Sequence, residues 1–217
     1  MELNPANILL GAEKLSLTLR PDQVEQLLRH AVLLLKWNQR INLTAITEPR
    51  EVIEKHLLDS LAVAAHLPSG RLLDAGSGAG FPGIPIRIMR PDIDVWLVDS
   101  IEKKVAFLKS VLAELKLPGI RAQAVRLNGQ PDKERLPSFD ALVSRALAAP
   151  ADWLQLADRY RAPGGRVYCL LGSLDAAPER CGPLSRVRTV EFELPFSAAR
   201  RKLVEYADPA PSVERGG

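Results

Sequence analysis

The feature that most constrains the fold is a run of small residues between an apolar segment and a helix-like segment, at residues 72–83. Leu72 and Leu73 end the apolar run, Asp74 follows, and glycines stand at positions 76, 78, 80 and 83. Glycine lets a chain turn sharply and approach a ligand without a clash at Cβ. In open α/β sheets such loops lie at the carboxyl ends of the strands, where ligands bind. The segment therefore predicts a strand, a ligand-binding loop and a helix.

Short apolar runs alternate with helix-length segments from residue 70 onward, which favours a parallel sheet covered on both faces. We predict helices near 84–89, at 103–115 and at 153–160. Strands are expected at 71–75, 95–98, 120–125, 139–144 and 166–171. The segments 187–194 and 203–206 are candidates for a closing antiparallel hairpin.

The segment before residue 69 has a helical pattern instead. After Pro21, apolar residues recur at three- and four-residue intervals, which is typical of one helix face. They are Val24, Leu27, Leu28, Ala31, Leu34 and Leu35. A second helix is expected at about 49–65. We therefore divide the chain into a helical N-terminal extension (1–68), a ligand-binding domain (69–207) and a flexible tail rich in Pro and Gly (208–217).

The composition excludes several classes of protein. Of the 217 residues, 47% are hydrophobic and 25% charged, as in ordinary globular domains. No apolar run approaches the ~18 residues of a membrane span, and the first residues lack the layout of a signal peptide. Cys169 and Cys181 cannot build a disulfide framework, and His30 and His66 have no ligand cluster at metal spacing. We expect a cytoplasmic protein without a metal site.

The net charge of +3 is unevenly distributed along the chain. Residues 1–120 hold 14 basic and 14 acidic side chains, whereas residues 121–217 hold 15 and 12. The excess therefore lies entirely in the second half. This permits nucleic-acid binding without requiring it.

Two cofactors compete for the glycine loop. Gly78, Gly80 and Gly83 match a dinucleotide fingerprint, which would indicate an NAD(P)-dependent oxidoreductase. Asp74 followed by Gly76, Gly78 and Gly80 matches the first motif of S-adenosylmethionine methyltransferases. A carboxylate before the loop would repel a pyrophosphate, but it suits the ammonium group of S-adenosylmethionine. Asp74 therefore favours the methyltransferase interpretation.

Asp99 follows the second predicted strand, 19 residues after Gly80. A carboxylate at this position can accept hydrogen bonds from two ribose hydroxyls in either cofactor class. Asp99 and Ser100 are also residue types that cap helices. We expect Asp99 to bind ribose and Ser100 to cap the helix that follows.

Five motifs in order give the chain a family resemblance. Four of them are Lys36-Trp37-Asn38 with Asn42-Leu43-Thr44, His56-x-Leu58-Asp59-Ser60, the glycine loop continued through Phe81-Pro82-Gly83-Ile84-Pro85, and Asp99-Ser100 with Lys103-Lys104 and Phe107-Leu108. The fifth is Ser144-Arg145-Ala146. Over residues 20–172 this series resembles the glucose-inhibited division protein B family, whose members methylate guanine N7 in small-subunit (16S) ribosomal RNA.

The resemblance implies a Rossmann-like class I methyltransferase with a seven-stranded, mostly parallel sheet and a helical N-terminal extension. It also implies that S-adenosylmethionine is bound by Gly76, Gly78, Phe81, Asp99, Leu127, Asn128 and Arg145. Asp74 and Ser100 join these as cofactor-binding candidates. Three places depart from the family pattern: Asn128-Gly129 replaces an acidic pair, Leu171 replaces a lysine, and the segment 200–203 lacks a histidine.

Methylation at guanine N7 needs no general base, because N7 has a free lone pair, so positioning can supply the catalysis. Arg145 is the candidate catalytic residue, since arginine can bind guanine bidentately. Candidate RNA contacts are Lys103, Lys104, Arg126 and Arg201. The implied partner is small-subunit ribosomal RNA, free or in the assembled subunit, bound by a monomer. A non-catalytic RNA-binding protein stays open as an alternative, because Leu171 replaces a family lysine.

His56, Asp59 and Ser60 stand on one helix face and resemble a hydrolytic triad in composition. No oxyanion site accompanies them, which argues against hydrolysis. We expect them to hold the N-terminal helices against the cofactor domain. Trp37, Asn38 and Asn42 are expected to supply a core aromatic ring and amides that close a turn.

Overall fold

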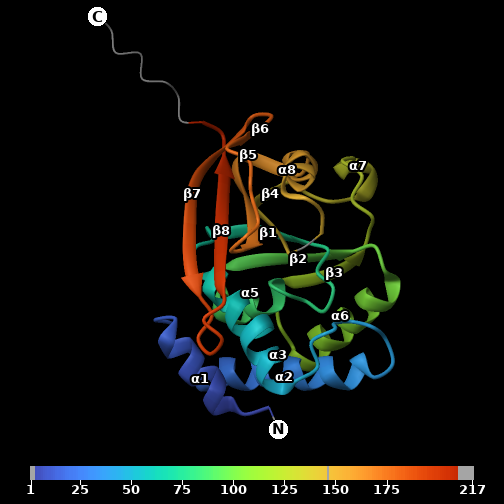
Figure 1. Cartoon of the computed structure of the whole chain (residues 1–217). Helices are drawn as coiled ribbons and strands as arrows, with labels where there is room; N and C mark the ends of the chain where they lie inside the picture. Colours follow the sequence, from blue (N-terminus) through green and yellow to red (C-terminus); the bar gives the residue numbers. More distant parts are fainter. Residues whose placement is uncertain (1–2, 146, 210–217) are drawn as a thin grey trace, which may run out of the picture.

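The computed structural model describes residues 3–145 and 147–209, and its centre is a single sheet (Figure 1). The strands follow the order β3-β2-β1-β4-β5-β8-β7-β6. Their bounds are β1 Gly70–Ala75, β2 Ile93–Asp99, β3 Ile120–Ala124, β4 Phe139–Arg145, β5 Arg161–Gly172, β6 Arg180–Cys181, β7 Leu184–Glu193 and β8 Arg200–Ala207. Strands β1 to β5 run parallel, and β8, β7 and β6 continue the sheet antiparallel. The predicted α/β class and the closing hairpin are confirmed.

The prediction of seven strands is wrong by one. The eighth strand, β6, is only two residues long and pairs with the start of β7. A two-residue strand is too short to produce an alternating pattern in the sequence. The order 3-2-1-4-5 of the parallel strands is that of a doubly wound sheet, in which the strand order reverses between β1 and β4. Ligands of such sheets bind at the carboxyl ends of the strands beside this point.

The helices lie on both faces of this sheet. Their bounds are α1 Pro5–Lys14, α2 Pro21–Asn38, α3 Pro49–Val52, α4 Asp59–Ala64, α5 Gly83–Met89, α6 Glu102–Leu115, α7 Pro131–Glu134 and α8 Pro150–Asp158. Neighbouring residues of a strand point to opposite faces, and Leu72 and Leu73 accordingly belong to two different buried clusters. The Leu72 cluster packs α1, α2, α5 and α6 on one face, and the Leu73 cluster packs α8 on the other (Figure 1).

The two N-terminal helices expected from the sequence are present. In α2 the residues Val24, Leu27, Ala31 and Leu34 are buried, as their spacing predicted. The expected helix at 49–65 consists of α3, a π-helical segment η1 (Ile53–Leu58) and α4. Single π-helical turns are rare and frequently occur at functional sites. The segment η1 contains His56.

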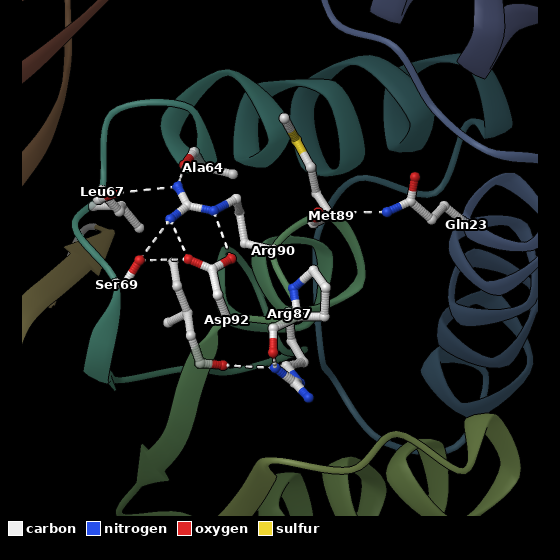
Figure 2. A network of polar contacts seen from close by, with 10 residues as sticks. Gln23, Ala64, Leu67, Ser69, Arg87, Met89, Arg90 and Asp92 are labelled. Carbon is white, nitrogen blue, oxygen red and sulfur yellow. Dashed lines mark hydrogen bonds and ion pairs between the residues drawn. The ribbon is translucent and has the colours of Figure 1, made fainter.

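Polar contacts join these helices to α5 and to the segment between α5 and β2 (Figure 2). Arg90 donates hydrogen bonds to the carbonyls of Ala64 and Leu67 at the end of α4, at 3.1 and 3.0 Å, and pairs with Asp92. The side chain of Gln23 on α2 donates to the carbonyl of Ile88 at 2.8 Å. Carbonyls at helix ends lack partners within their own helix, so these contacts fix both α4 and α5.

The predicted flexible tail begins at Asp208, directly after β8, and its flexibility stays a prediction. Asp208 accepts two hydrogen bonds from Arg161, both at 2.7 Å, which anchors the residue after β8. The remainder of the predicted tail, residues 210–217, lies outside the described residues. Within the described parts of the chain, none of the helices has the length and apolar character that crossing a membrane would require.

Candidate active site

The glycine loop between β1 and α5 is held against the end of β2. The backbone N–H groups of Gly76 and Ser77 both donate to the carbonyl of Val98, at 2.8 and 3.1 Å. Gly76, Gly78 and Gly80 have φ values of +69°, +55° and +86°. Residues with a Cβ rarely adopt this left-handed conformation. The backbone conformation of the turn therefore favours glycine at these three alternating positions.

Asp74 lies behind this loop. Its side chain is fully buried, and its Oδ2 accepts a hydrogen bond from the N–H of Gly83 at 2.8 Å. Burial raises the pKa of Asp74 to about 7. The second oxygen, Oδ1, has no hydrogen-bond partner among the described residues. The predicted contact with S-adenosylmethionine stays a prediction, and in this structure Asp74 joins the loop to the start of α5.

The Asp74–Gly83 contact also bears on the dinucleotide alternative. Gly83 is the third glycine of that fingerprint and begins α5. A pyrophosphate would bind the free N–H groups at this helix start. The Gly83 N–H already donates to a buried carboxyl group, so the site does not suit a pyrophosphate.

Asp99 ends β2 beside the glycine loop. Its Oδ2 accepts from the N–H of Gly78 at 3.0 Å, and its Oδ1 accepts from the N–H of Ile101 at 2.9 Å. Each carboxylate oxygen can accept a further hydrogen bond. The prediction that Ser100 caps α6 is wrong: the cap residue is Ile101, because the chain becomes helical only at Glu102. Asp99 bonds the cap residue instead.

A cavity of about 560 Å³ opens at this edge of the sheet. Cavities of this size are typical of small-molecule sites. Most of its lining comes from the ends of β1 to β4 and from the segments that follow them: Gly76, Val98, Asp99, Ser100, Ile101, Lys104, Val125, Arg126, Leu127, Asn128, Arg145, Leu147 and Leu156. We call it the cofactor cavity. Six of the nine predicted cofactor residues line it, namely Gly76, Asp99, Ser100, Leu127, Asn128 and Arg145.

The other predicted residues divide between the wall and the surroundings of this cavity. Lys104 and Arg126, predicted as RNA contacts, line it. Asp74, Gly78 and Phe81 do not appear in its wall, and Lys103 is exposed on the first turn of α6. The N–H of Gly78 donates to Asp99 at the end of β2, and the carboxyl group of Asp74 accepts from the N–H of Gly83 at the start of α5.

The residues of the cofactor cavity fit S-adenosylmethionine. Val98, Val125 and Leu127 offer apolar surface for an adenine ring, and the Asp99 carboxylate can accept from a ribose diol. Both features lie beside a loop whose glycines permit close approach of a ligand. The methyl group that this cofactor supplies is electrophilic because it is attached to a sulfonium.

The segment after β3 is fixed by a contact that the sequence did not predict. Glu134 on α7 accepts from the N–H of Asn128 at 2.9 Å and from the hydroxyl of Tyr160 at 2.5 Å. The Tyr160 oxygen in turn accepts from the N–H of Gly129 at 2.7 Å. Burial and the Glu134 contact raise the pKa of Tyr160 to about 12. The sequence places Pro131 at a helix start, but four residues are too few for a helical pattern.

A second cavity of about 480 Å³ adjoins the first. Its lining comes from the N-terminal helices, the ends of β4 and β5, and the closing hairpin: Ile46, Lys55, His56, Asp59, Ser144, Arg145, Ala148, Pro150, Trp153, Cys169, Leu170, Leu171, Gly172, Asp175, Ala176, Phe192, Arg201 and Lys202. We call it the hairpin cavity. It contains Arg201, the fourth predicted RNA contact. Arg145 lines both cavities.

Arg145 ends β4 and is held by the N-terminal segment η1. Its Nη1 donates to the carbonyl of Lys55 at 2.9 Å, and its Nη2 lies 2.8 Å from Nδ1 of His56. The carboxylate of Asp59 lies 3.9 Å from Nη1 and 3.5 Å from Nε of Arg201. Burial lowers the pKa of Arg145. Because a guanidinium has five N–H donors, Arg145 retains donors for a ligand.

Phe81 lies between two histidine rings rather than in a cavity wall. Its ring centroid is 4.6 Å from that of His30 and 4.6 Å from that of His56, with interplanar angles of 21° and 12°. Burial lowers the pKa of His30 to about 4. Burial and the nearby Arg145 lower the pKa of His56 to about 3. Both rings are therefore neutral near pH 7.

His56 and Asp59 hold the N-terminal helices against the sheet, as predicted, through their contacts with Arg145 and Arg201. Ser60 takes no part in this, because its hydroxyl donates to the carbonyl of His56 within the helix. Asn38 closes a turn by bonding the backbone of Leu43 and Thr44, and Trp37 packs edge-on against Phe107. Ala146 of the Ser-Arg-Ala motif lies outside the described residues.

The strand order, the glycine loop and the acid at the end of β2 define a Rossmann-like class I methyltransferase that uses S-adenosylmethionine. A solved structure described as a SAM-dependent methyltransferase from Aquifex aeolicus has the same fold, with a TM-score of 0.54, 18% identity and coverage of 75% of this chain and 94% of that chain. TrmN from Thermus thermophilus has a TM-score of 0.53 at 17% identity, covering 72% and 53%.

The family can be assigned from sequence comparison. The family model described as rRNA small subunit methyltransferase G matches residues 23–183. A relative named ribosomal RNA small subunit methyltransferase G, from Anaeromyxobacter sp. (strain Fw109-5), is 46% identical over 90% of this chain and 94% of its own length. One with the same name from Myxococcus xanthus (strain DK1622) is 43% identical over 91% and 94%. The chain belongs to this family, and the resemblance to the glucose-inhibited division protein B family is confirmed.

Proposed function

We propose that this chain transfers the methyl group of S-adenosylmethionine to N7 of a guanine in small-subunit (16S) ribosomal RNA. The observation that carries the proposal is the position of Arg145, which lines both cavities at once. A cofactor in the first cavity and a base in the second would meet at this side chain. The family assignment supports ribosomal RNA as the source of the base.

The chemistry requires little from the protein beyond positioning. Guanine N7 carries a lone pair in the plane of the ring and no proton, so no side chain has to remove one. The new bond forms between N7 and the methyl carbon as the bond from that carbon to sulfur breaks, and the positive charge moves to the guanine. Holding the two reactants in line and excluding water can supply most of the catalysis.

Arg145 is the proposed catalytic residue because it can donate to guanine O6, beside N7, with the N–H groups that the protein leaves free. Asp59 supports this role, since its carboxylate lies near both Arg145 and Arg201. The proposed cofactor-binding residues are Asp74, Gly76, Gly78, Phe81, Asp99, Ser100, Leu127, Asn128 and Arg145. The proposed RNA contacts are Lys103, Lys104, Arg126 and Arg201.

Arg145→Ala and Arg145→Lys test this proposal. We expect methyl transfer to fall more than about tenfold in Arg145→Ala, which corresponds to ~1.4 kcal/mol of transition-state stabilisation. Arg145→Lys should recover little, because lysine lacks the planar fork of donors. The measurement is incorporation of tritiated methyl groups into unmethylated small-subunit RNA, with mass analysis of the product base. Wild-type rates in Arg145→Ala would remove Arg145 from the site, and a methyl group on any other atom would contradict the N7 assignment.

Methyl incorporation, together with ligand titrations, also tests the remaining alternatives. A non-catalytic RNA-binding protein would bind the RNA without incorporating label. An oxidoreductase would bind NADH rather than S-adenosylhomocysteine in calorimetric titrations. Free RNA and purified small subunits, assayed side by side, would identify the preferred substrate of an enzyme that we propose to be monomeric and cytoplasmic.

A further inference from the structure

The guanidinium of Arg145 is held by a histidine that the proposed reaction does not itself use. Nη2 of Arg145 lies 2.8 Å from Nδ1 of His56, on the π-helical segment η1. The other ring nitrogen of His56, Nε2, lies 2.9 Å from Oγ1 of Thr44. His56 as a whole residue is 4% exposed. Thr44, His56 and Arg145 therefore form a short chain of polar contacts that ends at the two cavities.

The chemistry of the groups fixes where the proton of this histidine lies. Arginine has hydrogen-bond donors and no acceptor, so Nδ1 of His56 must accept. A neutral imidazole with a bare Nδ1 carries its proton on Nε2. That proton is donated to Oγ1 of Thr44, which also accepts from the N–H of Ile46 at 3.0 Å. The contacts at both ends of the ring thus select one tautomer.

The position of Thr44 is itself fixed by the turn before η1. The side-chain amide of Asn38 donates to the carbonyl of Thr44 at 2.9 Å and accepts from its N–H at 3.0 Å. The His56 ring is stacked on Phe81, with centroids 4.6 Å apart and an interplanar angle of 12°. A ring held on one face and at both nitrogens has little freedom to rotate.

We propose that Thr44 and His56 are positioning residues for methyl transfer: the Thr44 hydroxyl accepts from the Nε2–H of His56 and holds the ring in place, so that its bare Nδ1 orients the Arg145 guanidinium towards the base. This role rests on the proposed function, because it acts through Arg145. Without the Thr44 hydroxyl, the Nε2–H of His56 loses its acceptor, and the ring is free to turn away from Arg145. The guanidinium would then lose its orientation.

The tautomer can be measured directly in the whole protein. The chain contains three histidines, so the signal that disappears in His56→Gln identifies His56 in a nitrogen-15 NMR spectrum of the imidazole rings. We expect a protonated Nε2 and an unprotonated Nδ1 in the wild type, and shifted resonances of the two His56 nitrogens in Thr44→Val, because the Nε2–H loses its acceptor. A protonated Nδ1 in the wild type, or unchanged His56 resonances in Thr44→Val, would overturn the proposal.

The kcat of methyl transfer in two matched Thr44 variants tests whether the hydroxyl contributes to catalysis. Thr44→Val keeps the shape of the side chain and loses the hydroxyl, whereas Thr44→Ser keeps the hydroxyl. We expect kcat to fall about tenfold in Thr44→Val, which equals the effect of one hydrogen bond of ~1.4 kcal/mol, and to recover in Thr44→Ser. The Kd for S-adenosylhomocysteine should change less than kcat in both variants, because Arg145 is only one of the nine proposed cofactor-binding residues. Equal kcat in Thr44→Val and Thr44→Ser would contradict the positioning role.

Two variants of His56 separate its nitrogens. The amide of His56→Asn can place an acceptor near the former Nδ1, whereas that of His56→Gln reaches the former Nε2. We expect His56→Asn to keep the higher kcat, since it alone can still hold Arg145. A higher kcat in His56→Gln would contradict this, and binding of S-adenosylhomocysteine reports whether each variant is folded. If the wild type transfers no methyl group, the proposed function fails, whereas the NMR result still decides the tautomer.

Discussion

Asp74 belongs to the glycine-loop motif, and its ionised form destabilises the fold. Its carboxyl group is fully buried, with a pKa raised to about 7 by burial. An acid whose pKa is higher in the folded state contributes stability below its unfolded pKa, near 4, and loses that stability as the pH rises through the folded value. Ionised Asp74 therefore opposes folding above pH 7.

Asp74→Asn should remove this pH dependence while keeping an acceptor for the N–H of Gly83. We expect the variant to gain stability relative to the wild type between pH 4 and pH 7, by up to ~4 kcal/mol at about 1.4 kcal/mol per unit of pKa shift. Urea denaturation at a series of pH values measures the difference. A difference in unfolding free energy that is constant from pH 4 to pH 8 would show that Asp74 does not titrate in this range.

Among single residues, the sequence predicted the ligand-binding positions where a tight turn needs glycine or where a carboxylate ends a strand. The left-handed glycines and Asp99 are where the loop motif placed them. The sequence could not predict the stacking of Phe81 between His30 and His56, because those rings come from separate helices. Contacts between distant segments depend on tertiary packing and leave no local pattern.

Among the helices and strands, the end of α4 depends on one side chain from beyond α5. Arg90 bonds the carbonyls of Ala64 and Leu67 and also pairs with Asp92 (Figure 2). We expect Arg90→Ala to lower the free energy of unfolding by about 2–3 kcal/mol, since hydrogen bonds from a charged donor contribute roughly 1.5–3 kcal/mol. Denaturant titration measures this.

Asp92→Asn is the matched control for Arg90→Ala. The Asp92 side chain is 44% exposed, and exposed ion pairs contribute about 0–1 kcal/mol. We therefore expect a small change in the free energy of unfolding. If Asp92→Asn costs as much as Arg90→Ala, then the ion pair, and not the contacts with the carbonyls of Ala64 and Leu67, accounts for the stability.

Most elements of ordinary length were predictable, and the shortest ones were not; the ten-residue α1 lies in the segment predicted as helical, but its bounds were not predicted. The repeats of apolar residues predicted α2, α6 and the parallel strands near their observed bounds. The helix α7 and the strand β6 have four and two residues, which is about one period of a helix or a strand and too few for a repeat to be visible. The missing α7 matters most, because its Glu134 holds the segment that lines the cofactor cavity.

The whole molecule joins the N-terminal helices and the sheet through one buried cluster. Ile8 of α1 and Leu27 of α2 belong to the same cluster as Leu72 of β1. The division at residue 68 therefore marks a change in the sequence pattern. That the two parts are separate domains stays a prediction. The shared cluster has a functional consequence, because His56 and Asp59 reach the hairpin cavity from the N-terminal helices.

Basic side chains line both cavities, which predicts how RNA binding should depend on salt. Lys104 and Arg126 line the cofactor cavity, and Arg201 lines the hairpin cavity. Each phosphate contact contributes about 0.7–0.9 to the slope of log affinity against log salt. We expect Arg126→Ala and Arg201→Ala each to reduce the slope by roughly that amount in binding titrations with small-subunit RNA.

Lys103 and Lys104 allow a sharper comparison on neighbouring residues. Lys103 is exposed on the first turn of α6, whereas Lys104 lines the cofactor cavity. If the RNA backbone follows the cavities, Lys104→Ala should reduce the salt slope more than Lys103→Ala. If it follows the outer face of α6, the order reverses. A slope that none of these substitutions changes would mean that the RNA phosphates are bound elsewhere on the molecule, and that Arg126 and Arg201 act on the reactants alone.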